Sequence, residues 1–243
     1  KAVVLSVNSP GGSALSSDVI WREIMLTKKT KPVIVSMGDV AASGGYYIAC
    51  AADSIFAQPN TITGSIGVFG IIPNMQKFFN SKLGITFDGV KTGRFADLGT
   101  VSRPLTDAEK LILQHEVNKT YNTFTQKVAD GRKRSQTYID SIGQGRVWSG
   151  SEALKNGLVD RIGNIDDAIA SAAKKANLKD FKIVNYPEQI DPLKSLFNDS
   201  ADKVKSYFVR QELGPNFIYY EQLKSALSFS GVQTRLPYTI TVK

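Results

Sequence analysis

The sequence predicts an α/β protein in which parallel strands alternate with crossover helices. Three short apolar segments, at residues 2–7, 33–37 and 55–57, have the length and composition of buried strands. Helical or Gly-rich segments separate them, and the connections between these elements are short. Hydrophobic residues make up 42% of the 243 residues and charged residues 21%, which is enough apolar material to fill a core.

The first 90 residues give the elements of this sheet in turn. Ser16 or Ser17 can cap a helix, and Ile20 and Ile24 lie one turn apart on one of its faces. The expected elements are a strand at 2–7, a turn at 8–12, a helix from Ser16 or Ser17 to about Thr27, a strand at 33–37, a turn at 38–42, a short apolar helix ending near Ala52, a strand at 55–57, a helix near 74–82 and a strand at 85–90.

A long helix is expected after an irregular loop at residues 93–104. Thr106 and Glu109 have the spacing of a capping box, which marks a helix start. The helix should run to about Lys133, because apolar residues recur at helical spacing along it: Leu113, Val117, Tyr121, Phe124 and Val128. Two shorter helices are expected near residues 151–156 and 166–176.

The character of the sequence changes beyond about residue 177. We therefore expect a domain at residues 1–176 that carries the chemistry and a C-terminal extension at 177–243 that serves assembly. The extension is expected to hold a strand at 181–186, helices at 191–213 and 217–227, and a strand at 238–242. The chain opens inside a predicted strand without an initiator Met, so we expect it to be part of a longer protein.

Composition excludes several classes of protein. The net charge is +8, which a solvated basic surface explains, with an anionic membrane surface as the alternative partner. Nucleic acid is not expected, because no basic-aromatic motif is present. With Cys50 as the single cysteine and His115 as the single histidine, we expect no internal disulfide, no metal site and no cofactor. No apolar run approaches the length of a membrane-spanning helix.

Three Gly/Ser clusters, at residues 9–12, 41–47 and 63–67, each lie at a strand end or a helix start, where α/β folds place their sites. Each cluster alone is typical of a turn or a cap, but together they fit nucleophilic catalysis. Ser43 is expected at a helix N-terminus, which favours developing negative charge. Backbone N–H groups of Gly44 and Gly12 could bind an oxyanion, since glycine allows close approach of a substrate.

The strings at residues 7–12 (Val-Asn-Ser-Pro-Gly-Gly), 41–47 (Ala-Ala-Ser-Gly-Gly-Tyr-Tyr) and 63–67 (Thr-Gly-Ser-Ile-Gly) resemble the signal peptide peptidase A family in order and spacing. These are membrane-anchored serine proteases with a Clp protease/crotonase-like fold, a ββα superhelix, and the resemblance covers about residues 1–176. It implies the following roles: Ser43 as nucleophile, Gly12 and Gly44 as oxyanion hole, Ser65 as the residue that orients a lysine base, and Val68 and Phe69 as an apolar substrate pocket.

The base lysine is missing from its aligned place in this chain. Short family members carry it in the loop that follows the next strand, where Ala96 stands here. Long, two-repeat members place the serine in the C-terminal repeat and the lysine in the N-terminal repeat, and this chain resembles that C-terminal half. Lys91 and His115 are the alternative bases within the chain, although His115 is expected to face away from the apolar stripe. Cys50 is expected in the core, and the lysines at 28, 29 and 31 on the surface.

The resemblance implies a peptidase that degrades signal peptides or other apolar peptides. Its expected partners are the N-terminal half of the same protein and further copies of itself, with a tetramer implied for the long form. The expected location is the periplasmic side of a bacterial inner membrane, through an N-terminal anchor outside this chain. Two other functions stay open: a crotonase-like acyl-CoA enzyme, and a non-catalytic half that only assembles, in which Ser43 is a helix cap. Tyr46 and Tyr47 are expected to pack the core, with a substrate groove as the alternative.

Overall fold

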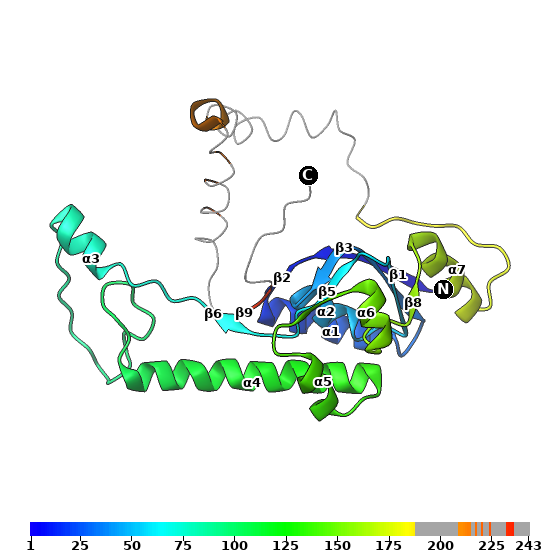
Figure 1. Cartoon of the computed structure of the whole chain (residues 1–243), viewed down its shortest axis with the longest axis horizontal. Helices are drawn as coiled ribbons and strands as arrows, with labels where there is room; N and C mark the ends of the chain where they lie inside the picture. The colour runs from blue at the N-terminus through cyan, green and yellow to red at the C-terminus, as the bar shows by residue number, and fades with distance from the viewer. Residues whose placement is uncertain (188–208, 215–216, 218–219, 221–223, 225–231, 236–243) are drawn as a thin grey trace. The chain divides into compact units, whose positions relative to one another are not determined.

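The computed structural model describes residues 1–187, 209–214, 217, 220, 224 and 232–235. The chain divides into two compact units. One unit comprises residues 1–178 together with 231–243, and the other comprises residues 179–230. The three Gly/Ser clusters all lie in the first unit, and its architecture is described here (Figure 1).

The first unit is built on a six-stranded sheet whose central strand is β3. This strand pairs with β1 along one edge and with β4 and then β5 along the other. All these pairings are parallel, and only the pairing of β5 with β7 is antiparallel within this sheet. The predicted α/β class is therefore confirmed. The strands are β1 (Val3–Ser9), β3 (Val33–Ala42), β4 (Ser54–Ala57), β5 (Ile62–Gly64), β7 (Val147–Ser149) and β8 (Arg161–Ile162).

Helices cover both faces of the sheet, because side chains along β3 alternate between them. Val33 and Val35 pack on the side that holds helices α1 and α2, whereas Ile34 packs with Ala168 and Ala172 of helix α7. The helices are α1 (Ala14–Thr27), α2 (Gly44–Ala49), α4 (Asp107–Arg132), α5 (Gln136–Ile142), α6 (Gly150–Lys155) and α7 (Ile165–Lys175). None of the described helices is long and apolar enough to cross a membrane.

Two element boundaries differ from the predictions for local reasons. The expected turn at residues 38–42 is strand, because Val40 and Ala42 pair with β5 and extend the ladder. Helix α1 begins before the expected caps, because Ser13 caps it and accepts the Ser16 backbone N–H at 3.4 Å.

The long helix α4 was predicted almost to the residue. Its N-cap Thr106 and Glu109 form the expected capping box, and Lys133 ends it in a left-handed conformation. Burial follows the predicted stripe only in part, since Phe124 and Val128 are fully buried whereas the three earlier members are half-buried. The C-terminal half of α4 therefore packs on the core, where the rings of Phe124 and Tyr47 lie 4.7 Å apart.

Several predicted elements are absent or lie outside the described residues. Residues 85–90 form no strand, because no strand of the described residues pairs with them, and the Val90 side chain is fully exposed. The helix expected at 74–82 is a short α3 (Gln76–Phe78) that continues as the π-helix η1 (Phe79–Leu83). Residues 181–186 are not a strand. The helices expected at 191–213 and 217–227 lie mostly, and the strand at 238–242 wholly, outside the described residues.

An ion-paired cluster ties the irregular segment before α4 to the start of that helix. The Arg103 guanidinium donates to both carboxylate oxygens of Asp97, at 2.8 and 2.7 Å, and to both of Glu109, at 2.8 and 2.6 Å. Glu109 also accepts the Thr106 backbone N–H at 2.8 Å, and its side chain is only 1% exposed. Hydrogen bonds from Arg103 and the Thr106 backbone lower the pKa of Glu109 to about 2.

This cluster predicts an acid-sensitive step in stability. Because the pKa of Glu109 is lower when folded, its stabilising effect is full above its ordinary value of 4.5 and is lost as the pH falls toward about 2. Glu109→Gln should therefore flatten the fall of melting temperature with pH over this range. Asp107→Asn is the matched control, since Asp107 forms an exposed pair with Lys110 and should leave the slope nearly unchanged. A slope for Glu109→Gln equal to that of the unmodified chain would contradict the prediction.

Candidate active site

The three Gly/Ser clusters meet at the carboxyl ends of neighbouring parallel strands. Ser9 at the end of β1 pairs with Ala41 of β3, and Ala41 pairs in turn with Thr63 of β5. The next residues on β3 and β5 lead directly to Ser43 and Ser65. The sheet register therefore brings together three segments that lie far apart in the sequence, at the edge where α/β folds bind their ligands.

Ser43 occupies a strained backbone position between β3 and α2. Its φ is 53° and its ψ is −116°, a conformation that a side chain other than glycine rarely adopts. Two backbone hydrogen bonds hold it there: its N–H donates to the Gly64 carbonyl at 2.9 Å, and its carbonyl accepts the Tyr47 N–H at 2.8 Å. A serine on such a sharp strand-to-helix turn has the geometry of a nucleophile elbow.

Gly45 explains why the sequence needs glycines after this serine. A Cβ atom at Gly45 would lie 2.6 Å from the Ser9 carbonyl oxygen, so only glycine allows α2 to approach the end of β1. Strand β2 (Gly11–Ser13), which contains Gly12, follows at once and lies against α2. Gly44 is the first residue of α2. The two predicted oxyanion-hole glycines thus lie on two elements that are in contact.

The Ser43 hydroxyl faces the segment after Ser65. Its hydrogen-bond contact is the Gly67 carbonyl oxygen at 3.5 Å, and it makes no side-chain cap of its own helix. Ser43 as a residue is fully buried. Within the described part of the chain, no lysine, histidine or carboxylate hydrogen-bonds to this hydroxyl.

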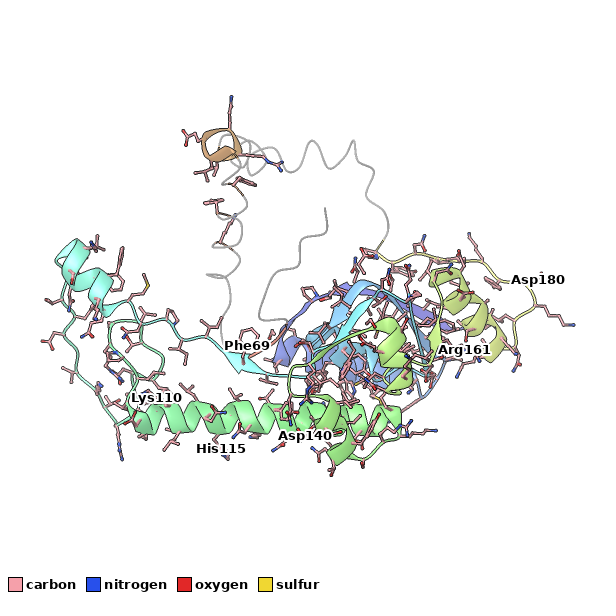
Figure 2. All side chains as sticks on the ribbon, viewed as in Figure 1. Phe69, Lys110, His115, Asp140, Arg161 and Asp180 are labelled. Carbon is pink, nitrogen blue, oxygen red and sulfur yellow. The ribbon has the colours of Figure 1, made fainter. Side chains whose placement is uncertain are left out.

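Ser65 lies beside a cavity of about 410 Å³ between the β5–β6 segment and α4. Its φ is 46°, and its N–H donates to the Arg146 carbonyl at 2.7 Å. Its hydroxyl has no hydrogen-bond partner among the described residues. Val68 and Phe69 line the same cavity, and Figure 2 shows Phe69 on β6 (Phe69–Gly70). Ser65, Val68 and Phe69 therefore line one cavity. Gly67 lines it too, and its carbonyl oxygen is the contact of the Ser43 hydroxyl, so Ser43 lies next to this cavity.

The alternative bases and nucleophile lie in other surroundings. Lys91 pairs with Asp97 at 2.7 Å, and Ala96 is exposed in the same irregular segment. His115 is exposed on α4, as predicted (Figure 2). The Cys50 thiol is buried and donates to the Tyr47 carbonyl at 3.0 Å, and burial raises its pKa to about 12, so it is an inert core thiol.

The expected surface lysines at 28, 29 and 31 differ among themselves. Lys28 is half-buried, and its ammonium donates to the Ala51 carbonyl at 2.6 Å and pairs with Asp53 at 3.3 Å. Lys29 and Lys31 are exposed, as predicted. All three residues lie between the end of α1 and the start of β3, at the end of that strand opposite to Ser43.

Sequence reasoning missed a polar cluster that fixes α2, the helix that begins directly after Ser43. The Tyr47 hydroxyl donates to Asp18 of α1 at 2.8 Å, and the Lys127 ammonium of α4 also pairs with Asp18. The same ammonium lies 3.7 Å from the centre of the Trp21 ring, a cation–π arrangement. No local pattern could reveal this cluster, because its members come from three helices.

Both tyrosines that follow Gly45 are core residues, as expected. Tyr46 is fully buried and donates its hydroxyl to the Leu158 carbonyl at 2.8 Å, and Tyr47 is 2% exposed. Among the described residues, no group of histidine, cysteine, aspartate or glutamate side chains could hold a metal ion. The chemistry that this arrangement can support is nucleophilic attack by Ser43 next to backbone N–H groups, with the base still to be supplied.

Comparison with known proteins gives one family and several relatives. A family model described as Peptidase family S49 matches residues 25–179. "Protease 4" of Salmonella typhi is 42% identical over 207 residues, which is 85% of this chain and 33% of that protein. "Putative signal peptide peptidase SppA" of Enterococcus faecium is 37% identical over 187 residues, 76% of this chain and 54% of that protein. The chain thus spans about a third to a half of the length of these relatives.

Among solved structures, a ClpP1 mutant from Listeria monocytogenes is similar, with a TM-score of 0.44 and 19% sequence identity. The similarity covers 70% of this chain and 78% of that chain.

The strain at Ser43 predicts an unusual order of stability. Ser43→Ala and Ser43→Gly both remove the hydroxyl, but only glycine adopts a φ of 53° without strain. The glycine variant should therefore be more stable than the alanine variant by about 1 kcal/mol, measured by urea denaturation. Ser36, within β3, is the control, and there glycine should be less stable than alanine. If the glycine variant were less stable than the alanine variant at Ser43 as well as at Ser36, Ser43 would not be strained.

Proposed function

Because this chain belongs to peptidase family S49, we propose that it carries the nucleophile of a serine protease that cleaves apolar peptides by acyl transfer through Ser43. The observation that carries the proposal is the strained, elbow-like Ser43 at the edge where three parallel strands end. Such a backbone conformation costs free energy, and it presents the side chain at a strand-to-helix turn, as nucleophilic serines require.

The proposed reaction proceeds in two stages. The Ser43 hydroxyl oxygen attacks the carbonyl carbon of the peptide bond while the base takes its proton, and the N–H groups of Gly12 and Gly44 stabilise the oxyanion. The C–N bond then breaks, and the leaving amine takes the proton from the base. Water attacks the resulting acyl ester in the same way, which releases the acid and restores the Ser43 hydroxyl.

A lysine from outside this chain is the proposed base. Within the chain, Lys91 is engaged by Asp97, and Ala96 has no proton acceptor in its side chain. Among the described residues, the Ser65 hydroxyl has no hydrogen-bond partner beside an open cavity, so it is available to accept a hydrogen bond from an incoming amine or to donate one to it. A lysine held there must be desolvated, because only burial lowers its pKa enough for the neutral amine to act as base. The N-terminal repeat of the whole protein is the proposed source.

The proposed substrates are signal peptides and other apolar peptides. Val68, Phe69 and Val117 give the cavity beside Ser65 an apolar wall, which suits apolar side chains. The name of the Enterococcus faecium relative points to the same substrate class. We further propose assembly of the whole protein as a homo-oligomer, a tetramer for a two-repeat protein, anchored on the periplasmic face of a bacterial inner membrane. The basic net charge of +8 suits an anionic surface.

Labelling with a serine-reactive phosphonate tests the nucleophile. The whole protein should be labelled at Ser43 and should lose both labelling and proteolysis in Ser43→Ala. Ser65→Ala should keep some labelling but lower the rate about 10- to 1,000-fold and change the pH–rate profile, since the base loses its positioning group. Wild-type rates in Ser65→Ala at every pH would show a purely structural role. Failure of Ser43 to react at all would favour a crotonase-like acyl-CoA enzyme or a non-catalytic half.

A mixing experiment tests the source of the base. Residues 1–243 alone should be inactive on an apolar peptide ester, because a serine hydroxyl without a base is a poor nucleophile at neutral pH. Addition of the N-terminal repeat should restore cleavage, and addition of the same repeat with its base lysine replaced by Ala should not. Strong cleavage by the chain alone would contradict the split site and would direct attention to Lys91, which Lys91→Ala then tests.

A further inference from the structure

Helix α2, which begins directly after Ser43, has little stability of its own. It is six residues long, it starts with Gly44 and Gly45, and the Ser43 side chain does not cap it. Glycine is a poor helix former, and so short a helix is not stable alone in water. Gly45 cannot be exchanged for a better helix former, because a Cβ atom there would collide with the Ser9 carbonyl oxygen. Contacts with other elements must therefore hold the first turn of α2 in place.

The position of this turn decides the geometry of the proposed reaction. Gly44, its first residue, is one of the two proposed oxyanion-hole donors. The Tyr47 N–H, one turn later, donates to the Ser43 carbonyl at 2.8 Å. A fixed N–H group stabilises an oxyanion only when it is aimed at the developing charge, and a misplacement of about 1 Å can cost roughly 100-fold in rate. A small shift of the turn would therefore slow the reaction without unfolding the protein.

The Tyr47 side chain ties this turn to two other helices, since α2 contacts both α1 and α4 (Figure 1). Its hydroxyl donates to Oδ1 of Asp18, on α1, at 2.8 Å. Burial and this hydrogen bond raise the pKa of the Tyr47 hydroxyl far above its ordinary value of 10.0, so it stays protonated and is the donor. The same Oδ1 atom accepts a hydrogen bond from the Lys127 ammonium of α4. One carboxylate oxygen thus joins three helices.

The Asp18 carboxylate is held in one place although its side chain is 46% exposed. Its partner Lys127 is only 17% exposed, and the ammonium lies 3.7 Å from the centre of the Trp21 ring, one turn after Asp18 on α1. Phe124, one turn before Lys127 on α4, contacts the Tyr47 ring at 4.7 Å between centres. Because the cation is held by both a ring and a carboxylate, neither helix can move without loss of one of these contacts.

We propose that Asp18 is a positioning residue for acyl transfer, which acts through the Tyr47 hydroxyl on the first turn of α2. The inference rests on the proposed function. In it, Asp18 touches neither the substrate nor the reacting atoms, and its hydrogen bond keeps the turn from shifting away from the oxyanion. The alternative is a contact that only stabilises the fold. The two roles differ in the rate per intact active site, since a purely stabilising contact changes the number of folded molecules and not their rate.

The first experiment measures kcat and KM of the whole protein on an apolar peptide ester. Active sites are counted by phosphonate labelling carried to completion. Asp18→Ala should lower kcat per labelled site about tenfold and leave KM within about twofold, because the misplaced donors act only in the transition state. Asp18→Asn keeps an oxygen that can accept the Tyr47 hydroxyl, so it should recover most of the loss. An unchanged kcat per labelled site in Asp18→Ala would overturn the inference, even if the variant melts at a lower temperature.

A double-variant cycle tests whether Asp18 acts through Tyr47. Tyr47→Phe keeps the ring and removes the hydroxyl, so it should also lower kcat about tenfold. The double variant should lose about tenfold and not about 100-fold, because both changes remove the same hydrogen bond. Tyr138→Phe is the matched control: it removes a tyrosine hydroxyl that donates to the Asn156 carbonyl at 3.1 Å, on α5, and should leave kcat unchanged. A loss of about 100-fold in the double variant would contradict action through Tyr47.

Amide hydrogen exchange gives a readout that needs no substrate. Amides of α2 should exchange faster in Asp18→Ala than in Tyr138→Phe, while those of β3 stay protected. If Ser43 reacts with the phosphonate in no variant but α2 still exchanges faster in Asp18→Ala, the proposed function fails and the anchoring of α2 by Asp18 stands. If Ser43 reacts equally fast in Asp18→Ala and in the unmodified protein, only the present inference fails.

Discussion

The backbone ladder of β3 is the constraint on which the rest of the structure depends. This strand pairs with β1 on one side and with β4 and β5 on the other, and its register places Ser9, Ala41 and Thr63 in line. A shift by one residue would turn every buried side chain of β3 to the opposite face and would move Ser43 away from Gly67. The site is thus fixed by hydrogen bonds between backbones, and the side chains in it are positioned by the sheet before they contact each other.

The sequence was most informative where the determinants are local. The capping box at Thr106 and the glycines around Ser43 depend on spacing within a few residues, so the starts of α4 and α2 could be predicted. It was uninformative where the partner is distant. Residues 85–90 have the composition of a strand but no partner strand among the described residues, whereas strand β9 (Val232–Arg235) pairs with two edges, those of β2 and β6. Asp18 and Lys127 lie 109 positions apart, which no periodic pattern connects.

The candidate site shows the same division between local and distant determinants. Motif spacing predicted that Ser43, Gly44 and Ser65 would lie at strand and helix ends, and the positive φ angles of both serines match that position. What the sequence did not reveal is the support behind them: the Arg146 carbonyl that holds Ser65, and the Asp18 carboxylate that ties α2 to α1 through the Tyr47 hydroxyl. These contacts fix the geometry and come from elements that follow or precede the motifs by many residues.

The strands that join the main sheet last determine when the site can form during synthesis of the chain. Strand β7 closes on β5 from residues 147–149, and β8 closes on β4 from residues 161–162, roughly a hundred positions after the strands that they join. Such distant pairings fold slowly, because a long loop must close before the contacts reward it. The wall that holds Ser65 is completed by the Arg146 carbonyl, so a nascent chain on the ribosome has no assembled candidate site until that residue has emerged. A chain that folds in this order keeps the candidate site around Ser43 and Ser65 unformed while its own unfolded polypeptide is most open to cleavage.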